Sequence, residues 1–451
     1  MNETPKVKLG FIGLAAMVVG MVVGAGIFNI PQNMAADAGP AAVGLSWIIT
    51  AMGMLLLVFT FKTLSDSRPE LNAGIYEYAL RGFGPLAGFL IAWGYWLSAA
   101  FANVAYAVML NDAFGTFFPR LLSHGWITVG FGSALIWIIY LIVINGLKTA
   151  KILTTLLAGV KISTIGLIIV LMVMNFRIGT FSAELWSSLT DLAGLGEQVR
   201  STMLVTLWCF VGIEGATVMS GRAARKRDVG RASVAGFFCA WTLYVLVSLL
   251  CFGCMARAEL AGMNNPSVAY VLRALCGDWG FYFVIISVII SLLGGWLAWS
   301  VICGEVPYSA ATVGIMPGCF LRLNRYGMPA LGLLVSSVIM QLFLMLVAMA
   351  DDVYLTALNA TGMMILPCYL LSGAYLWKIA RGSQRLLGIG CTLFCAWMIY
   401  AGGLSLFLST ALFYLLGIGF HLRARVERGQ PMLSRRLAIA IALLLALAII
   451  F

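Results

Sequence analysis

The sequence predicts an all-α integral membrane protein, and three observations support this fold class. Of the 451 residues, 62% are hydrophobic and 10% are charged, and the mean hydropathy is +1.00. The apolar residues occur in repeated runs of roughly 20, the length that an α-helix needs to cross the hydrocarbon core of a bilayer. Glycines interrupt two of these runs, which indicates helices broken at membrane depth.

About twelve transmembrane helices are predicted, followed by a short apolar tail. As a helix, the tail at 437-451 reaches about 22 Å, which is short of a typical hydrocarbon core, so a short thirteenth span stays an open alternative. The twelve expected spans cover residues 9-31, 41-61, 84-110, 126-146, 152-175, 199-220, 232-256, 280-304, 328-350, 354-377, 385-402 and 404-422.

The basic residues predict the orientation of these spans. The chain has 28 Lys and Arg against 17 Asp and Glu, a net charge of +11. Cytoplasmic loops carry an excess of Lys and Arg, and this excess appears when the N-terminus is placed inside. Lys161 then lies within a span, and five arginines lie in the predicted outer loops: Arg120, Arg177, Arg200, Arg257 and Arg273. All other Lys and Arg fall on the cytoplasmic side.

Several function classes are disfavoured by what the sequence contains. The basic run from Arg222 to Arg231 is expected to face anionic lipid headgroups, not nucleic acid. The two histidines, His124 and His421, lie far apart, and the ten cysteines fall mostly within spans, which leaves little material for a metal site. No Ser-His-Asp or phosphate-loop pattern is found. We expect that the protein is not an enzyme and that it binds neither a metal nor a cofactor.

The first interrupted run contains Gly24, Ala25 and Gly26 within the span 9-31. Lipid offers no hydrogen-bond partners to unwound backbone, so such a break survives only where it lines a cavity. Many transporters consist of two inverted repeats of five helices whose first helices are both broken. The sixth span should therefore break too, and it carries Gly212 and Gly215 beside Glu214.

These paired breaks give the predicted domain organisation and a ligand class. The transporter core covers 1-422, with inverted repeats at about 9-175 and 199-377 and two accessory helices at 385-422; a basic cytoplasmic segment with the apolar tail covers 423-451. Amides of Gly24, Ala25 and Gly26 at the positive end of a half-helix suit a carboxylate. Freed carbonyls near Trp208, Val211 and Gly212 suit an ammonium group. One amino acid would satisfy both ends.

Ordered blocks along residues 9 to 320 resemble one transporter family. The chain is similar to the basic amino acid/polyamine antiporters of the APC superfamily, and closest to their arginine/ornithine branch. The blocks are Val23 to Phe28 with Pro31 to Asn33, Arg68 to Leu71 through Gly74 to Tyr76, Trp93 to Leu97 with Asn103, Leu207 to Gly215, Ser220 to Ala223 with Arg227 to Gly230, and Gly304 to Pro307.

The resemblance implies a LeuT-type fold, alternating access, and the exchange of extracellular L-arginine for intracellular ornithine across a bacterial inner membrane. It also implies that Trp296 stacks on the cationic side chain of the substrate and that Asn103 binds its far end, with Tyr106 on the same helical face as Asn103. Relatives are often homodimers, so a homodimer is a further expectation, although no motif marks an interface.

The match to the arginine/agmatine branch is less complete. Ala25, Ala99 and Ala360 stand where that branch often has a serine, a cysteine and a serine, and Met21 stands in place of an asparagine. Backbone recognition survives these changes, but fewer polar side chains remain to bind a guanidinium group. Tyr106 agrees with the arginine/ornithine branch.

Three charged residues are expected inside the membrane and are assigned to gating or coupling. Lys161 lies about 15 Å into the fifth span, so it must face the protein interior. In proton-coupled relatives a fifth-span lysine resembles a substitute for sodium, so a coupling role and a fixed structural cation are both open. Glu214 is expected to hold the sixth-span break. Glu305, about 13 Å from Trp296 along the helix, is expected on the cytoplasmic pathway or paired with a loop arginine.

The alternatives to arginine/ornithine exchange are other transport modes. A proton-coupled cationic amino acid symporter would use Lys161, and other antiport pairs are arginine/agmatine, lysine/cadaverine and histidine/histamine. A receptor would need a signalling domain that the loops are too short to contain, and a channel would need a selectivity filter.

Overall fold

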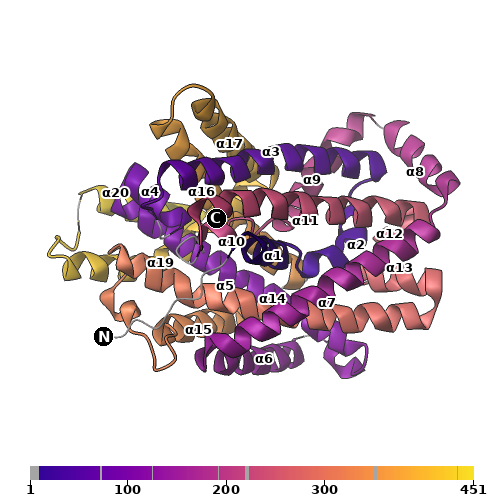
Figure 1. Ribbon diagram of the computed structural model, residues 1–451, viewed down its shortest axis with the longest axis horizontal. Coiled ribbons are helices and arrows are strands. Elements are labelled where there is room, and N and C mark those ends of the chain that lie inside the picture. The colour runs from indigo at the N-terminus through magenta and orange to yellow at the C-terminus, as the bar shows by residue number, and fades with distance from the viewer. Residues whose placement is uncertain are drawn as a thin grey trace.

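The computed structural model describes residues 10–71, 74–123, 125–190, 192–218, 223–349, 353–433 and 435–450. Long helices run side by side, as Figure 1 shows, with α4 and α20 toward the left of that view and α8, α12 and α13 at the right end. The first half contains α1 (Phe11–Val22), η1 (Ala25–Phe28), α2 (Ile30–Ala35), α3 (Pro40–Ser67), α4 (Ile75–Phe83), α5 (Pro85–Gly115), η2 (Pro119–Ser123), α6 (Trp126–Ile144), α7 (Leu147–Met174), α8 (Ile178–Thr190) and α9 (Leu192–Trp208).

The second half begins with a short helix after the second break. Its elements are α10 (Gly215–Val218), α11 (Lys226–Cys254), α12 (Arg257–Ala261), α13 (Ser267–Cys276), α14 (Asp278–Thr312), η4 (Gly318–Leu321), α15 (Ala330–Val347), α16 (Val353–Ile379), α17 (Gly382–Ala401), α18 (Leu404–Ser409), α19 (Ala411–Glu427) and α20 (Arg435–Ile450).

The expected multi-pass membrane fold is confirmed. In the described parts of the chain, nine helices are long and apolar enough to cross a membrane. The predicted span 152-175 falls on α7, whose part Gly159–Met174 passes the same test only together with Ile178–Leu189 of α8, which lies at 92° to it. The two remaining predicted spans are those divided by breaks, α1 to α2 and α9 to α10. The apolar part of the C-terminal tail, Leu437–Ala446, belongs to the shorter apolar helices.

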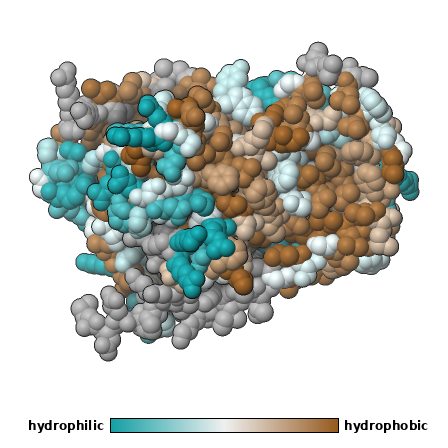
Figure 2. Space-filling view, turned by 45° about the horizontal axis from the view of Figure 1, so that its top comes forward, coloured by the Kyte–Doolittle hydropathy of each residue, from teal (hydrophilic) through white to brown (hydrophobic). Residues whose placement is uncertain are grey.

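The outer surface fits a bilayer. Figure 2 shows a broad hydrophobic face, with the hydrophilic residues gathered mainly toward one end. Large apolar side chains such as Ile12, Leu393 and Met349 are exposed. Water would oppose such exposure, whereas lipid tails favour it.

Four helices form a bundle around the two breaks: α1, α3, α9 and α11. Hydroxyl pairs join α3 to α9, with Ser46 Oγ 2.8 Å from Thr202 Oγ1 and Thr50 Oγ1 2.7 Å from Thr206 Oγ1. Trp47 Nε1 of α3 donates to Ser248 Oγ of α11 over 2.9 Å. Because hydroxyls buried in hydrocarbon need partners, these bonds fix which faces of the helices meet.

The short helices between spans were not predicted from the sequence. α4 is amphipathic and packs its Tyr76 and Tyr78 inward, while α8 exposes Ile178 and Trp186. Neither is a long apolar run, so hydropathy alone passes over them. In the basic run that was expected to face the cytoplasm, Arg231 lies 3.9 Å from Asp228 and its guanidinium stands over the Phe11 ring, whereas Arg222 lies outside the described residues.

Candidate functional site

The first break lies at Val23 and Gly24. Helix α1 ends at Val22, and a short 3-10 helix, η1, begins at Ala25. A helix that ends here leaves its last carbonyls without intrahelical donors. One of them, the Val22 carbonyl, accepts from the Tyr244 hydroxyl of α11 over 2.7 Å and from the Gly24 amide over 2.8 Å.

Lys161 of α7 supplies further donors to this break. Its Nζ donates to the Val23 carbonyl over 2.7 Å and to the Gly20 carbonyl over 3.1 Å. The residue is 2% exposed, so water does not replace these contacts. A cation is favourable at the negative C-terminal end of a helix, and here it compensates for the helical bonds that the break removes. Lys161 thus lies inside the protein, and its role in coupling remains a prediction.

The second break follows α9. The helix ends at Trp208, turns occupy residues 209 to 214, and α10 begins at Gly215. Gly212 has a φ of 110°, a conformation that side chains with a Cβ rarely adopt. The sixth-span break expected from the glycines is therefore present in the structure.

Glu214 is the centre of a buried hydrogen-bond network at this break. Its Oε1 accepts from the Tyr95 hydroxyl of α5 over 3.0 Å, and its Oε2 accepts from the Tyr369 hydroxyl of α16 over 2.7 Å and from the Gly212 amide over 3.1 Å. A buried carboxylate is tolerated when several donors satisfy it. Glu214 thereby connects the unwound segment to two other helices.

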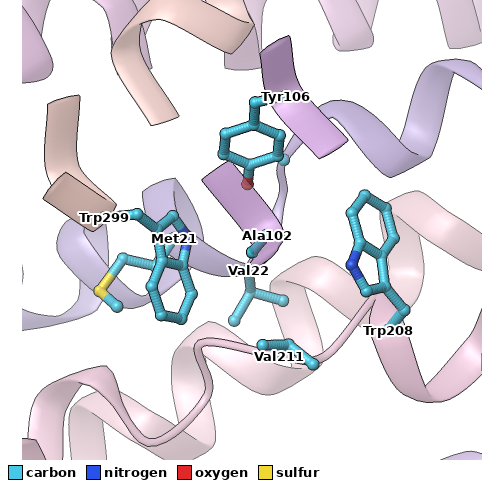
Figure 3. Close-up of a pocket in the computed structure, with 8 residues that line it drawn as sticks. Met21, Val22, Ala102, Tyr106, Trp208, Val211 and Trp299 are labelled. Carbon is cyan, nitrogen blue, oxygen red and sulfur yellow. The ribbon is translucent and has the colours of Figure 1, made fainter. Parts of the chain in front are cut away.

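A small cavity lies between the two breaks. Its volume is about 10 Å³, which is roughly the space that one water molecule needs. Figure 3 shows the rings of Tyr106, Trp208 and Trp299 around it, with Val22 and Val211 on another side. The lining residues are Met21, Val22, Gly24, Ala102, Tyr106, Trp208, Val211 and Trp299.

Glycines allow the backbone and the rings to approach closely. A Cβ on Gly26 would overlap the Trp208 ring, and one on Gly24 would stand 2.8 Å from the Tyr106 hydroxyl oxygen. A Cβ on Gly212 would lie 3.2 Å from Trp299 Cζ2. The glycines of both breaks therefore bring the unwound backbone against the aromatic walls of the cavity.

Several predicted binding residues meet at this cavity. Gly24, Tyr106, Trp208 and Val211 line it, and Gly26 and Gly212 pack against its rings. The backbone of Ala25 begins η1, while its side chain lies outside the described residues.

Two predicted residues lie behind the lining. Asn103 is fully buried, and its Nδ2 donates to Cys303 Sγ over 3.6 Å. Trp296 is also fully buried and is not among the lining residues; Trp299, three positions further along α14, takes that place. In this structure Trp299, and not Trp296, lines the cavity, and the expected contact of Trp296 with the substrate remains a prediction. The sequence contains both tryptophans on one side of the helix, but it does not give the rotation of α14.

Three further lining residues, Met21, Val22 and Ala102, were not among the predicted binding residues. All three are apolar residues within apolar spans; the signals were the family position of Met21 and the closeness of the others to the first break or to Asn103. Glu305 is half-buried on α14, near enough to Tyr76 of α4 to interact with it electrostatically, and it is not a lining residue. Its expected role on the cytoplasmic pathway remains a prediction.

The described part of the chain holds no group of three or more His, Cys, Asp or Glu residues suited to a metal ion. His421 is buried against the Phe89 ring, with 4.8 Å between the ring centroids, and His124 lies outside the described residues. The eight residues around the cavity carry no charged side chain. The cavity is therefore an aromatic and apolar compartment bordered by unwound backbone.

A comparison with protein families agrees with this geometry, since residues 9–447 match the model of the amino acid permeases. The chain belongs to the amino acid permease family of the APC superfamily. It is thus a multi-pass amino acid transporter and not an enzyme.

Individual relatives match over nearly the whole chain. The arginine/agmatine antiporter of Chlamydia pneumoniae is 42% identical over 436 residues, which is 92% of this chain and 90% of the relative. The arginine/agmatine antiporter of Chlamydia trachomatis serovar L2 (strain ATCC VR-902B) is 39% identical, covering 100% and 97%. A protein of Clostridium perfringens (strain 13), named for amino-acid transport with no substrate given, is 39% identical, covering 93% and 92%.

These relatives modify the expectation from the sequence. Membership of the APC superfamily is confirmed, but the named antiporters exchange arginine with agmatine, so ornithine as the partner has no specific support among them.

Proposed function

We propose that this permease is an antiporter that takes up L-arginine in exchange for agmatine, the decarboxylated product of arginine. The observation that carries the proposal is that three aromatic rings surround the small cavity between the two breaks. Aromatic faces attract a guanidinium or ammonium group, by about 2 kcal/mol when the pair is desolvated. The names of the Chlamydia relatives support the same pair of substrates.

In this proposal the backbone of the breaks recognises the amino acid part of arginine. The first N–H groups of η1, at Ala25 and Gly26, start a 3-10 helix and have no partners within it, which favours a carboxylate. The carbonyls of Trp208 and Val211 would accept from the α-amino group. Trp299, with Tyr106, would face the guanidinium. Agmatine lacks the carboxylate, so its affinity depends more on the aromatic walls.

Obligatory exchange follows if the protein changes between its outward-facing and inward-facing states only with a ligand bound. A ligand that bridges α1 to η1 and α9 to α10 stabilises the closed state through which both orientations pass. The N-terminus would lie in the cytoplasm, and the protein would lie in the inner membrane of a bacterium. A homodimer is part of the proposal through the family resemblance.

Arginine/ornithine exchange is the second candidate, because Tyr106, the residue that agrees with that branch, lines the cavity. The two exchanges differ in charge movement. Arginine and ornithine each carry one net positive charge near neutral pH, so their exchange is electroneutral. Agmatine carries two, so its exit against arginine entry moves one positive charge outward.

Labelled L-arginine uptake into proteoliposomes tests the proposal. Vesicles are preloaded with agmatine, ornithine or buffer, and a potassium gradient with valinomycin sets the membrane potential. We expect uptake into agmatine-loaded vesicles that increases when the inside is made positive. Uptake only against ornithine, independent of potential, would select the second candidate. Uptake into buffer-loaded vesicles under an inward proton gradient would replace both with symport.

A further inference from the structure

A hydrogen bond joins α5 to α14, two helices that each contribute residues to the lining of the cavity. Asn103 Nδ2 donates to Cys303 Sγ over 3.6 Å, and both residues are fully buried. Within the described parts of the chain, Asn103 Oδ1 has no hydrogen-bond partner. One end of the amide is held, therefore, and the other end is an unsatisfied acceptor.

This acceptor lies next to the lining of the cavity. Asn103 follows Ala102 and lies one helical turn before Tyr106, and both of these residues line the cavity. Cys303 lies one turn beyond Trp299, the lining residue on α14. A cavity of about 10 Å³ is too small for an amino acid, so a ligand must displace its walls. Asn103 adjoins two of these walls along α5, so its amide oxygen is the polar atom that the ligand can reach, whereas Cys303 lies beyond the amide nitrogen.

The chemistry of this layer suits a donor at the cationic end of the ligand. A buried acceptor without a partner is unfavourable, and a ligand that brings N–H groups removes this cost. A guanidinium group offers five N–H donors in a fixed plane, and an ammonium group offers three on a point charge. An amide oxygen with a fixed direction therefore discriminates between the two by geometry.

We propose that Cys303 is a positioning residue for substrate specificity. Its sulfur accepts from the Asn103 nitrogen, so that the Asn103 oxygen is the end of the amide presented to the cationic group of the substrate. Cys303 itself does not touch the substrate. The inference rests on the proposed function, in which a cationic amino acid occupies the cavity, and adds the residue that orients its polar contact.

Five variants test this role: Cys303→Ala, Cys303→Ser, Asn103→Ala, the double variant with alanine at both positions, and Cys251→Ala. The control, Cys251, is fully buried on α11, and its Sγ contacts Met172 Sδ at 4.0 Å. Full-length proteins are reconstituted, and the KM and maximal rate of arginine exchange are measured together with competition by lysine and ornithine. Thermal melting of each variant in detergent reports its stability.

We expect Cys303→Ala to raise the KM for arginine roughly tenfold, the effect of losing one hydrogen bond to a charged group, and to leave the maximal rate nearly unchanged. Competition by lysine and ornithine should change much less, so the preference for arginine falls. The double variant should match Asn103→Ala, because both substitutions remove the same contact. Cys303→Ser, which keeps an acceptor, should restore most of the preference, and Cys251→Ala should resemble the wild type.

An unchanged arginine preference in Cys303→Ala would overturn the inference while leaving the proposed function intact. Effects of Cys303→Ala and Asn103→Ala that multiply in the double variant would do the same. A general loss of melting temperature with equal losses for all three substrates would also overturn it, because it would reveal packing alone. A wild-type protein that takes up no arginine under any loading would overturn the proposed function, and this inference with it.

Discussion

Lys161 shows how one side chain maintains a broken helix inside a membrane. Unwound backbone exposes carbonyls that lipid does not satisfy, and Lys161 Nζ donates to two of them, those of Gly20 and Val23. A midplane lysine is costly by at least about 2.5 kcal/mol unless it is paired in this way. The break and the buried cation therefore depend on each other.

Replacing Lys161 with methionine should damage both folding and transport. The substitution keeps a long side chain but removes the donors to the Gly20 and Val23 carbonyls, at about 1.5–3 kcal/mol for a hydrogen bond from a charged group. We expect a lower melting temperature and at least a tenfold loss of arginine exchange. Lys62→Met is the matched control, since Lys62 pairs with Asp66 on the surface and such pairs contribute little. Equal behaviour of the two variants would contradict this role of Lys161.

Coupling by Lys161 is a separate question with its own measurement. If the lysine exchanges a proton during transport, arginine uptake by the wild type will respond to a pH gradient at zero membrane potential. If Lys161 is a fixed cation, uptake will ignore the gradient. We expect the second outcome, because two carbonyls already hold the ammonium group in place.

The two tryptophans of α14 should separate binding from packing. Trp299 lines the cavity and Trp296 does not, although both are almost fully buried. Trp299→Leu should raise the KM for arginine about 30-fold, the factor that corresponds to a cation-π contact of about 2 kcal/mol. Trp296→Leu should lower the melting temperature with a much smaller change in KM. The reverse pattern in the transport assay would assign the substrate contact to Trp296.

The second broken helix is stabilised by contacts to its neighbours. Helix α9 is joined to α3 by two hydroxyl pairs, and the segment after it is joined to α5 and α16 through Glu214. Helix α9 and the unwound segment that follows it thus have different partners. A change in the distance between α3 and α5 would bend the chain at the break between them.

Glu214→Gln tests this connection. Glutamine keeps the size of the side chain but offers one acceptor atom where three donors converge from Tyr95, Tyr369 and the Gly212 amide. We expect a loss of about 1–3 kcal/mol in the free energy of unfolding and a large fall in exchange rate. Glu197→Gln on the exposed part of α9 is the control and should change neither. Wild-type stability and rate in Glu214→Gln would refute the connection.

The close packing of the first break against Trp208 can be tested by substituting Gly26. Gly26→Ala introduces a methyl group that overlaps the Trp208 ring, so either η1 or the ring must shift. Exchange should fall by at least tenfold, as for other overpacked sites that cost about 1–3 kcal/mol. Gly166→Ala in α7 meets no atom within 4 Å and should be active. An active Gly26→Ala variant would mean that the contact is not needed for transport.

For the whole molecule, hydropathy and charge were sufficient to predict the membrane fold. Both breaks were predicted, because glycines that recur inside apolar runs at matching positions of two predicted repeats are typical of broken helices. The helices α8, α12 and α13 were not predicted, since short amphipathic segments lack a long apolar run. Their place at one end of the molecule follows from packing against neighbouring helices.

The site was predictable as a location but not in every residue. The breaks identify the two backbone segments, whereas the walls depend on the rotation of α5 and α14. That rotation is fixed by contacts distant in sequence, such as Gly294 against Leu157 and Gly295 against Tyr106. Without knowledge of these contacts, the sequence does not tell which of Trp296 and Trp299 faces the cavity, because the two lie less than one turn apart.

The small size of the cavity has a consequence for inhibition. Three rings nearly fill the space, so every ligand spends part of its binding energy on separating them, and measured affinities will understate the strength of the contacts. A substrate must still allow the rings to close around it. An arginine analogue with a bulky group on its guanidinium would wedge them open, and the carrier would be arrested with its ligand bound.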